Sequence, residues 1–248
     1  MKNNAKCIRG PKGVAAFTLV ELLTVIGIIA ILAAMLLTVI PAAIKSAKVK
    51  KAKLQMTALV SAIQGYESAY GHLPVSHAAQ AAATNDFTYG GTFQTASGPL
   101  DVGTPVSGAV LKNDQVIVVL MNFTNYPGTA TATVNMNGQE NPQKTSFLNA
   151  DMSGDTSSPG VGTDLVYRDP WGNPYVISLD LNDDSLCEDA FYKQAAISSG
   201  GLNGLILQPD GNYAFHGKIM VWSAGPDGKI SGSETATQGA NKDNALSW

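Results

Sequence analysis

One carboxylate in this sequence stands where a charged side chain is costly. Glu21 is the single charged residue in the apolar run Phe17–Ile40, which reads FTLVELLTVIGIIAILAAMLLTVI. An isolated charge inside a lipid bilayer is strongly unfavourable, so such a residue normally has a partner and a function. Glu21 is therefore the first candidate for functional chemistry, and that chemistry would be charge pairing.

The other reactive residue types do not form a catalytic set. His72, His77 and His216 are scattered, with no pair on one helix face and no CxxC nearby, which argues against a metal or catalytic role. Cys187 stands among four acidic residues that disfavour its thiolate. No GxSxG, P-loop or dinucleotide fingerprint occurs. The sequence predicts that the protein is not an enzyme.

Charge is unevenly distributed along the 248 residues. The formal net charge of −3 argues against a generally basic, nucleic-acid-coating protein. Residues 1–16 hold four cations and residues 45–53 hold five lysines, and neither segment contains an acid. Beyond residue 67, seven cations stand against 17 acids. We interpret the lysine run as a solvated helix face, with attraction to lipid head groups as the alternative.

The apolar run is long enough to cross a membrane. As a helix its 24 residues span about 36 Å, more than the roughly 30 Å of a hydrocarbon core. A cleaved secretory signal has an apolar stretch of only ~7–15 residues. A plain anchor fits the length but gives no reason for Glu21. A cut between Ala16 and Phe17 would explain Glu21, because the new α-amine of one subunit could then pair with Glu21 of its neighbour.

The basic leader, the sequence AFTLVEL and the long apolar helix resemble the prepilin class, which comprises type IV pilins and the pseudopilins of type II secretion. The resemblance implies that a dedicated peptidase removes residues 1–16 on the cytoplasmic side and N-methylates Phe17. It also implies that Glu21 is the carboxylate used in assembly. The family usually has Gly before the cut, whereas this chain has Ala16, which is also small.

The same resemblance implies a place in the cell and a set of partners. The charges that flank the apolar run are nearly equal in number, so the orientation follows from the resemblance alone. It implies a single pass through the inner membrane, with the N-terminus cytoplasmic and the C-terminal domain periplasmic. The implied partners are further copies in a helical homopolymer, the prepilin peptidase, minor pseudopilins, an inner-membrane assembly platform and membrane lipid, but no nucleic acid.

Residues 41–71 predict an amphipathic helix that continues the apolar one. Its apolar positions step by three and four residues, and Gly71 and Pro74 predict its end. Pro41 predicts a kink between the two parts. The apolar stripe consists of Val49, Ala52, Met56, Leu59, Ile63, Tyr66 and Tyr70.

The remainder of the chain divides into two regions. Residues 72–163 show little periodicity and are predicted to be loop-rich and variable. For the short apolar run Val116–Met121, periodicity leaves helix and strand open, and the cap-like Asn113–Asp114 ahead of it favours a short helix over a strand. Residues 164–248 predict a small antiparallel sheet. The expected fold is α+β, a pilin-like ladle in which a long N-terminal helix packs on this sheet. The predicted strands are Leu165–Tyr167, Tyr175–Leu179 and Lys218–Trp222, and the predicted turns are Gln208–Asn212 and Gly225–Gly228.

Three C-terminal motifs carry a second resemblance. DPWGNPY at Asp169–Tyr175, SAGPDG at Ser223–Gly228 and DNALSW at Asp243–Trp248 look like those of the major pseudopilin of type II secretion. In that family the C-terminal loop binds calcium through two aspartates and backbone carbonyls, as suits a hard cation.

Carried onto this chain, the second resemblance implies a calcium site. Asp227 and Asp243 would supply side-chain ligands, Ala224 a backbone carbonyl, and Glu234 a weaker additional ligand. The plain alternative is that Asp227 lies in a simple hairpin turn.

The sequence therefore predicts a structural subunit of a pseudopilus-like fibre in a type II secretion-like system. Two alternatives stay open. One is a surface type IV pilin. The other, of a different class, is a membrane-anchored extracytoplasmic binding protein or enzyme, which would need a catalytic constellation that the sequence does not display.

Overall fold

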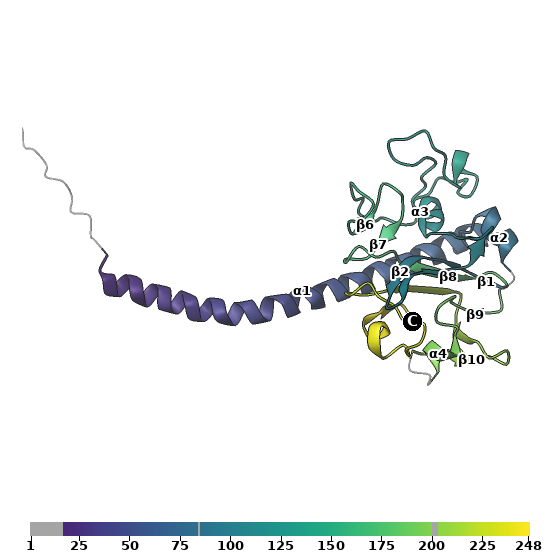
Figure 1. Ribbon diagram of the computed structural model, residues 1–248. Coiled ribbons are helices and arrows are strands. Elements are labelled where there is room, and N and C mark those ends of the chain that lie inside the picture. The colour runs from purple at the N-terminus through teal and green to yellow at the C-terminus, as the bar shows by residue number, and fades with distance from the viewer. Residues whose placement is uncertain (1–16, 84, 200–202) are drawn as a thin grey trace, which may run out of the picture. The chain divides into compact units, whose positions relative to one another are not determined.

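The computed structural model describes residues 17–83, 85–199 and 203–248. The predicted leader, residues 1–16 with the cut-site residue Ala16, lies outside the described residues. The chain divides into two compact units, Met1–Ile44 and Lys45–Trp248. One long helix, α1 (Leu19–Tyr70), contributes residues to both units (Figure 1).

In the first unit, α1 is apolar on all sides. Every large apolar side chain from Leu19 to Ile40 is between 45% and 78% exposed. By length and composition α1 could cross a membrane. Such a helix needs an apolar environment around it, since exposure of this much apolar surface to water is unfavourable. Pro41 lies inside α1.

In the second unit, α1 buries the predicted apolar stripe and stops where the sequence indicates. Its last residue is Tyr70, and Gly71 follows with φ 75°, a left-handed conformation typical of a helix C-terminus. The Gly71 amide donates to the Glu67 carbonyl at 2.7 Å. The fully buried members of the stripe are Ala52, Met56, Leu59, Ile63 and Tyr66.

A four-stranded antiparallel sheet forms the centre of the second unit. Its strands are β1 (Asp86–Tyr89), β8 (Val176–Asp180), β12 (Ile219–Ser223) and β13 (Ala245–Leu246), in the order β1-β8-β12-β13. Each neighbouring pair is antiparallel. The α+β fold with a long N-terminal helix and small antiparallel sheets is confirmed.

Both faces of the sheet are buried. Ile177 and Val221 belong to a hydrophobic core that also contains the α1 stripe. Val176 and Trp222 point the other way, into a second core with Phe191. Because successive strand side chains alternate between the two faces, β8 and β12 are buried at every position rather than at every second one.

Short elements surround this centre. They are α2 (His77–Ala82), β2 (Gly91–Thr95), β3 (Gly98–Val102), β4 (Pro105–Val106), β5 (Ala109–Val110), α3 (Asp114–Leu120), the 3₁₀ turn Met136–Gly138, β6 (Gly160–Val161), β7 (Tyr167–Arg168), β9 (Leu186–Cys187), α4 (Ala195–Ser198), β10 (Ile206–Leu207), β11 (Tyr213–His216) and the 3₁₀ turn Gly239–Asp243.

Two predictions of local structure need correction. Leu165–Tyr167 is not a strand, because Leu165 has φ 57° and its amide closes a turn on the Gly162 carbonyl at 2.9 Å; only Tyr167 enters β7. The central sheet is also not confined to residues 164–248, since β1 comes from the region predicted as loops and pairs with β8.

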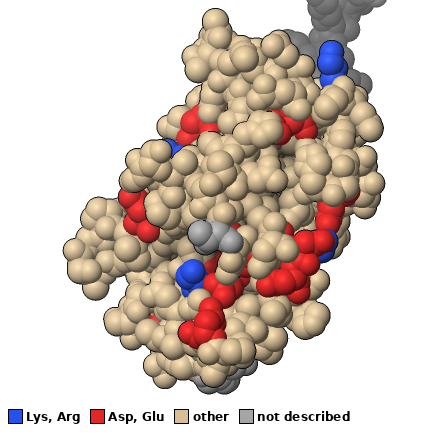
Figure 2. Space-filling model, turned by 90° about the vertical axis from the view of Figure 1, so that its right-hand side faces the viewer, with Lys and Arg blue, Asp and Glu red and all other residues tan. Residues whose placement is uncertain are grey.

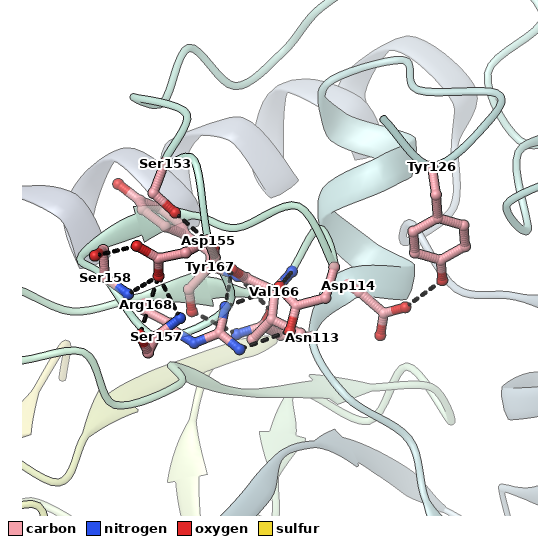
Figure 3. A network of polar contacts seen from close by, with 11 residues as sticks. Asn113, Asp114, Tyr126, Ser153, Asp155, Ser157, Ser158, Val166, Tyr167 and Arg168 are labelled. Carbon is pink, nitrogen blue, oxygen red and sulfur yellow. Dashed lines mark hydrogen bonds and ion pairs between the residues drawn. The ribbon is translucent and has the colours of Figure 1, made fainter. Parts of the chain in front are cut away.

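The short helix predicted over Val116–Met121 is confirmed as α3, but Asn113 does not cap it with its side chain. The side-chain amide nitrogen of Asn113 instead donates to the backbone carbonyls of Tyr167 and Tyr175, at 2.9 and 2.7 Å. The side-chain oxygen of Asn113 accepts from the backbone N–H of Tyr167. Figure 3 shows this contact beside a second one, in which Arg168 donates to the Val166 carbonyl. Asn113 thus joins the start of α3 to two segments more than 50 residues away.

Candidate functional site

Glu21 lies in the first turn of α1 and forms a reciprocal cap with Thr18. The Thr18 amide and hydroxyl donate to Glu21 Oε2 at 2.9 and 2.8 Å, and the Glu21 amide donates to Thr18 Oγ at 3.2 Å. This arrangement is a capping box, which satisfies donors that a helix start otherwise leaves open. No role was predicted for Thr18, although its spacing of three residues from Glu21 is the sequence signal for such a box.

The cap gives Glu21 a local partner in a single chain. Its carboxylate is held at the N-terminal end of the helix, where the helix dipole favours negative charge. The amine that a cut before Phe17 would create lies one residue from Thr18 in sequence. A positive group from another chain could therefore reach a carboxylate that is already oriented.

A buried aspartate joins two of the C-terminal motifs. Asp169 accepts hydrogen bonds from the amides of Trp171 and Asn173, at 2.8 and 2.9 Å, and from the Ser223 hydroxyl at 2.6 Å. Asn173 in turn donates to the Gly225 carbonyl at 3.0 Å. Burial raises the pKa of Asp169 despite these bonds. The segments Asp169–Tyr175 and Ser223–Gly228 are thus fixed against each other, a role that the sequence analysis did not give to Asp169.

The structure brings the two predicted calcium ligands into electrostatic contact. Burial of the Asp243 carboxyl, together with the charge of Asp227, raises the pKa of Asp243. Asp243 Oδ1 is buried and accepts no hydrogen bond. The two segments are in close contact, because a Cβ on Gly225 (φ 70°) would lie 2.1 Å from the Asp243 carbonyl oxygen. A buried carboxylate oxygen without a hydrogen bond, in a carboxyl group whose pKa a second negative charge helps to raise, is an arrangement that a cation would relieve.

The other two predicted ligands differ in their surroundings. Ala224 is fully buried at the end of β12. Glu234 accepts a hydrogen bond from the Ala240 amide at 2.9 Å, so its carboxylate is engaged by the 3₁₀ turn. Within residues 17–83, 85–199 and 203–248, no three His, Cys, Asp or Glu side chains converge to hold a metal ion. A cation here would need backbone carbonyls or water in addition to the two aspartates.

A polar cavity of about 510 Å³ lies beside the end of α1, and its charged groups pair with one another. Lys218 Nζ lies 2.9 Å from a Glu67 oxygen and 2.5 Å from an Asp183 oxygen. The acceptors Asp183 and Glu67 hold the pKa of Lys218 above its usual range. His77 Nε2 is 4.0 Å from Glu140 Oε1.

Cys187 is not a reactive thiol. Burial raises the pKa of its thiol, which keeps it in its unreactive, protonated form.

A family model described as the prokaryotic N-terminal methylation motif matches residues 11–37 of the chain. The matched segment includes Phe17, Thr18 and Glu21. No curated protein and no solved structure gives a match. The motif supports a type IV pilin-like protein, and the apolar helix near the N-terminus fits a single-pass membrane anchor.

Proposed function

We propose that this chain, with its N-terminal methylation motif, is a prepilin that is cut between Ala16 and Phe17 and polymerised into a fibre. The observation that carries the proposal is the position of Glu21, oriented by Thr18 at the start of a helix whose large apolar residues from Leu19 to Ile40 are all exposed. A lone membrane anchor would need only the cap, which an uncharged acceptor such as glutamine also provides, so the charge itself points to a partner. In a fibre, the amine of Phe17 on one copy neutralises Glu21 of the next.

Cleavage has a direct test. Mass spectrometry of the membrane-extracted protein should show a chain that begins at N-methylated Phe17. An Ala16→Gly variant restores the small residue that the prepilin class usually has before the cut, and it should be processed at least as completely. A mature chain that keeps Met1, or one that begins beyond Ala43, would contradict the proposal and favour a plain anchor.

We further infer that the fibre is the pseudopilus of a type II secretion-like system. The support is the Asp169 network, which holds together two motifs that resemble those of the major pseudopilin. The surface type IV pilin is the alternative, and it shares the same N-terminal chemistry. On this proposal the second unit lies in the periplasm, and the partners are the prepilin peptidase, an assembly platform and minor pseudopilins.

Calcium is the proposed ligand of the loop that contains Asp227 and Asp243. Its support is the buried, unpartnered Oδ1 of Asp243 and the repulsion between the two carboxylates. The backbone carbonyl of Ala224 is the proposed third ligand. Bound calcium would replace this repulsion with attraction and tie the C-terminal segment to the turn at Gly225–Gly228.

Removal of calcium should therefore destabilise the protein. A chelator is expected to lower the melting temperature of the detergent-extracted chain, because ligand binding to the folded state alone stabilises it. The double variant Asp227→Ala/Asp243→Ala should show no chelator response, while Asp151→Ala, a change at an exposed position, should respond like the wild type. An equal response in the double variant, or none in the wild type, would remove calcium from this loop.

A further inference from the structure

One face of α1 in the second unit is exposed although it carries an apolar side chain. Leu54 is 70% exposed, more than any other large apolar residue among the described residues of that unit. Lys50, Lys51 and Ala58 are also exposed, and they lie within three or four residues of Leu54 on the same side of the helix. We name these four residues the α1 patch.

The lysines of the α1 patch have no anionic partner in the part of the chain that the structure describes. The ion pairs of residues 17–83, 85–199 and 203–248 involve other cations, namely His77, Arg168, Lys193 and Lys218. The patch therefore presents an apolar centre beside two unpaired positive charges.

A second exposed patch has the opposite charge. Ile206 and Leu207 of β10 are 45% and 61% exposed. Strand β10 is at the edge of the three-stranded sheet β10-β11-β9, so one side of its backbone is open to another chain. The exposed Asp210 follows in the next turn, and it lines a small hollow together with Asp184. We name Ile206, Leu207, Asp184 and Asp210 the β10 patch.

Figure 2 shows that the right-hand side of Figure 1, where β10 is labelled, carries many acidic side chains with few Lys or Arg among them. In the hollow, Asp86 has one buried oxygen without a hydrogen-bond partner. Burial, reinforced by the charges of Asp180, Asp184 and Glu188, raises the pKa of Asp86 to about 7. The negative charges of these neighbours add to the effect of burial, and a positively charged surface would find favourable contacts beside them.

The two patches cannot satisfy each other within one chain. Figure 1 shows β10 well away from the place where α1 enters the second unit. The two patches are complementary, because each has an exposed aliphatic side chain and the charges beside them are opposite in sign. Complementary charge around an apolar centre is typical of a specific protein–protein contact.

We propose that the α1 patch of one copy docks on the β10 patch of a second copy. The contact is heterologous, because the two surfaces differ, so each added copy leaves one free patch at either end. A contact of this kind continues into a fibre instead of closing as a dimer. The proposal rests on the fibre-subunit function proposed above and adds the surfaces through which the second units touch.

Cysteine cross-linking tests the contact in assembled material. In a Cys7→Ser background, the variant Leu54→Cys/Leu207→Cys is assembled and treated with a bismaleimide. We expect a ladder of dimers, trimers and higher species, since every copy carries both halves of the contact. The buried Cys187 should not react. The matched control is Leu54→Cys/Leu100→Cys, whose second cysteine is exposed on β3, outside the β10 patch; it should give no ladder.

Charge reversal provides a second test of the proposed contact. Lys50→Glu/Lys51→Glu should lower the amount of sedimentable fibre by about tenfold or more, because like charges across an interface are strongly unfavourable. Adding Asp184→Lys/Asp210→Lys should restore it.

The outcomes separate the two proposals. Wild-type fibres without a cross-linked ladder, a ladder in the Leu100 control, or no recovery in the combined charge variant would overturn the contact while leaving the fibre function standing. A processed wild-type chain that forms no fibre at all would overturn the fibre function itself, and the contact with it.

Discussion

Replacement of Glu21 by glutamine is expected to abolish fibre assembly without affecting membrane insertion. Glutamine has the same shape, and its side-chain oxygen can still accept from the Thr18 amide and hydroxyl, so the cap on α1 is retained. Only the negative charge is lost. Leaving the Phe17 amine of the neighbouring copy without a counter-charge should cost about 3–5 kcal/mol for each contact.

The experiment compares three variants by membrane fractionation and by sedimentation of assembled fibres. Glu21→Gln and Glu21→Ala should both remain in the membrane as processed monomers. Thr18→Val removes the capping hydroxyl but keeps the charge, and it should still assemble, with a loss of about 1 kcal/mol at the helix start. Normal fibres from Glu21→Gln would show that the charge is not used in assembly.

Asp189→Ala is expected to destabilise the second unit strongly. Asp189 is fully buried, and its Oδ1 accepts from the amides of Phe191 and Tyr192 at 2.9 and 2.8 Å. Its Oδ2 accepts from the Ser178 hydroxyl at 2.7 Å and the Trp222 indole at 3.0 Å. Removing the carboxylate leaves the Phe191 and Tyr192 amides and the Trp222 indole without this acceptor, while the Ser178 hydroxyl still has Thr88 beside it, so the free energy of unfolding should fall by about 3–5 kcal/mol.

Denaturant unfolding of the detergent-extracted chain, followed by tryptophan fluorescence, measures this loss. Trp222 is a suitable reporter because its ring stacks on Phe191 in the same core. Asp151→Ala, at an exposed aspartate, is the matched control and should change stability by no more than about 0.5 kcal/mol. A loss at Asp189 no larger than that of the control would contradict the role assigned to the four hydrogen bonds.

Local signals in the sequence were sufficient for the long helix and for two strands. The α1 stripe repeats every three or four residues and ends at a glycine, and both features depend only on neighbours in the chain. The segments around Ile177 and Val221 combine β-branched residues with flanking turns, and they form β8 and β12 within one residue of the predicted bounds.

The missed elements depend on contacts between distant residues. β1 reads Asp-Phe-Thr-Tyr, an alternation of polar and apolar residues over only four positions, and it becomes a strand of the central sheet through its pairing with the distant β8. Leu165 is apolar and suited to a strand, but its backbone closes a turn.

At the candidate sites, residue types were easier to predict than their partners. Glu21 stood out because a charge is rare in an apolar helix, whereas the role of Thr18 became clear only from its hydrogen bonds. Asp169 is part of a motif that was identified, but its link to Ser223 spans 54 residues and has no local signature. Asp243 was predicted as a ligand, and its unpartnered oxygen is a property of the fold.

The uniform exposure of apolar side chains from Leu19 to Ile40 has a thermodynamic consequence. Lipid tails solvate leucine and isoleucine about as well as neighbouring helices do. Moving the apolar part of α1 from a bilayer into a bundle of identical helices would therefore change the hydration of its apolar surface very little. Burial of apolar surface alone therefore gives almost no free-energy preference for the proposed fibre over the membrane-embedded monomer. In the proposed fibre, assembly along this part of the molecule would then be driven by charge neutralisation and by work supplied from outside the subunit.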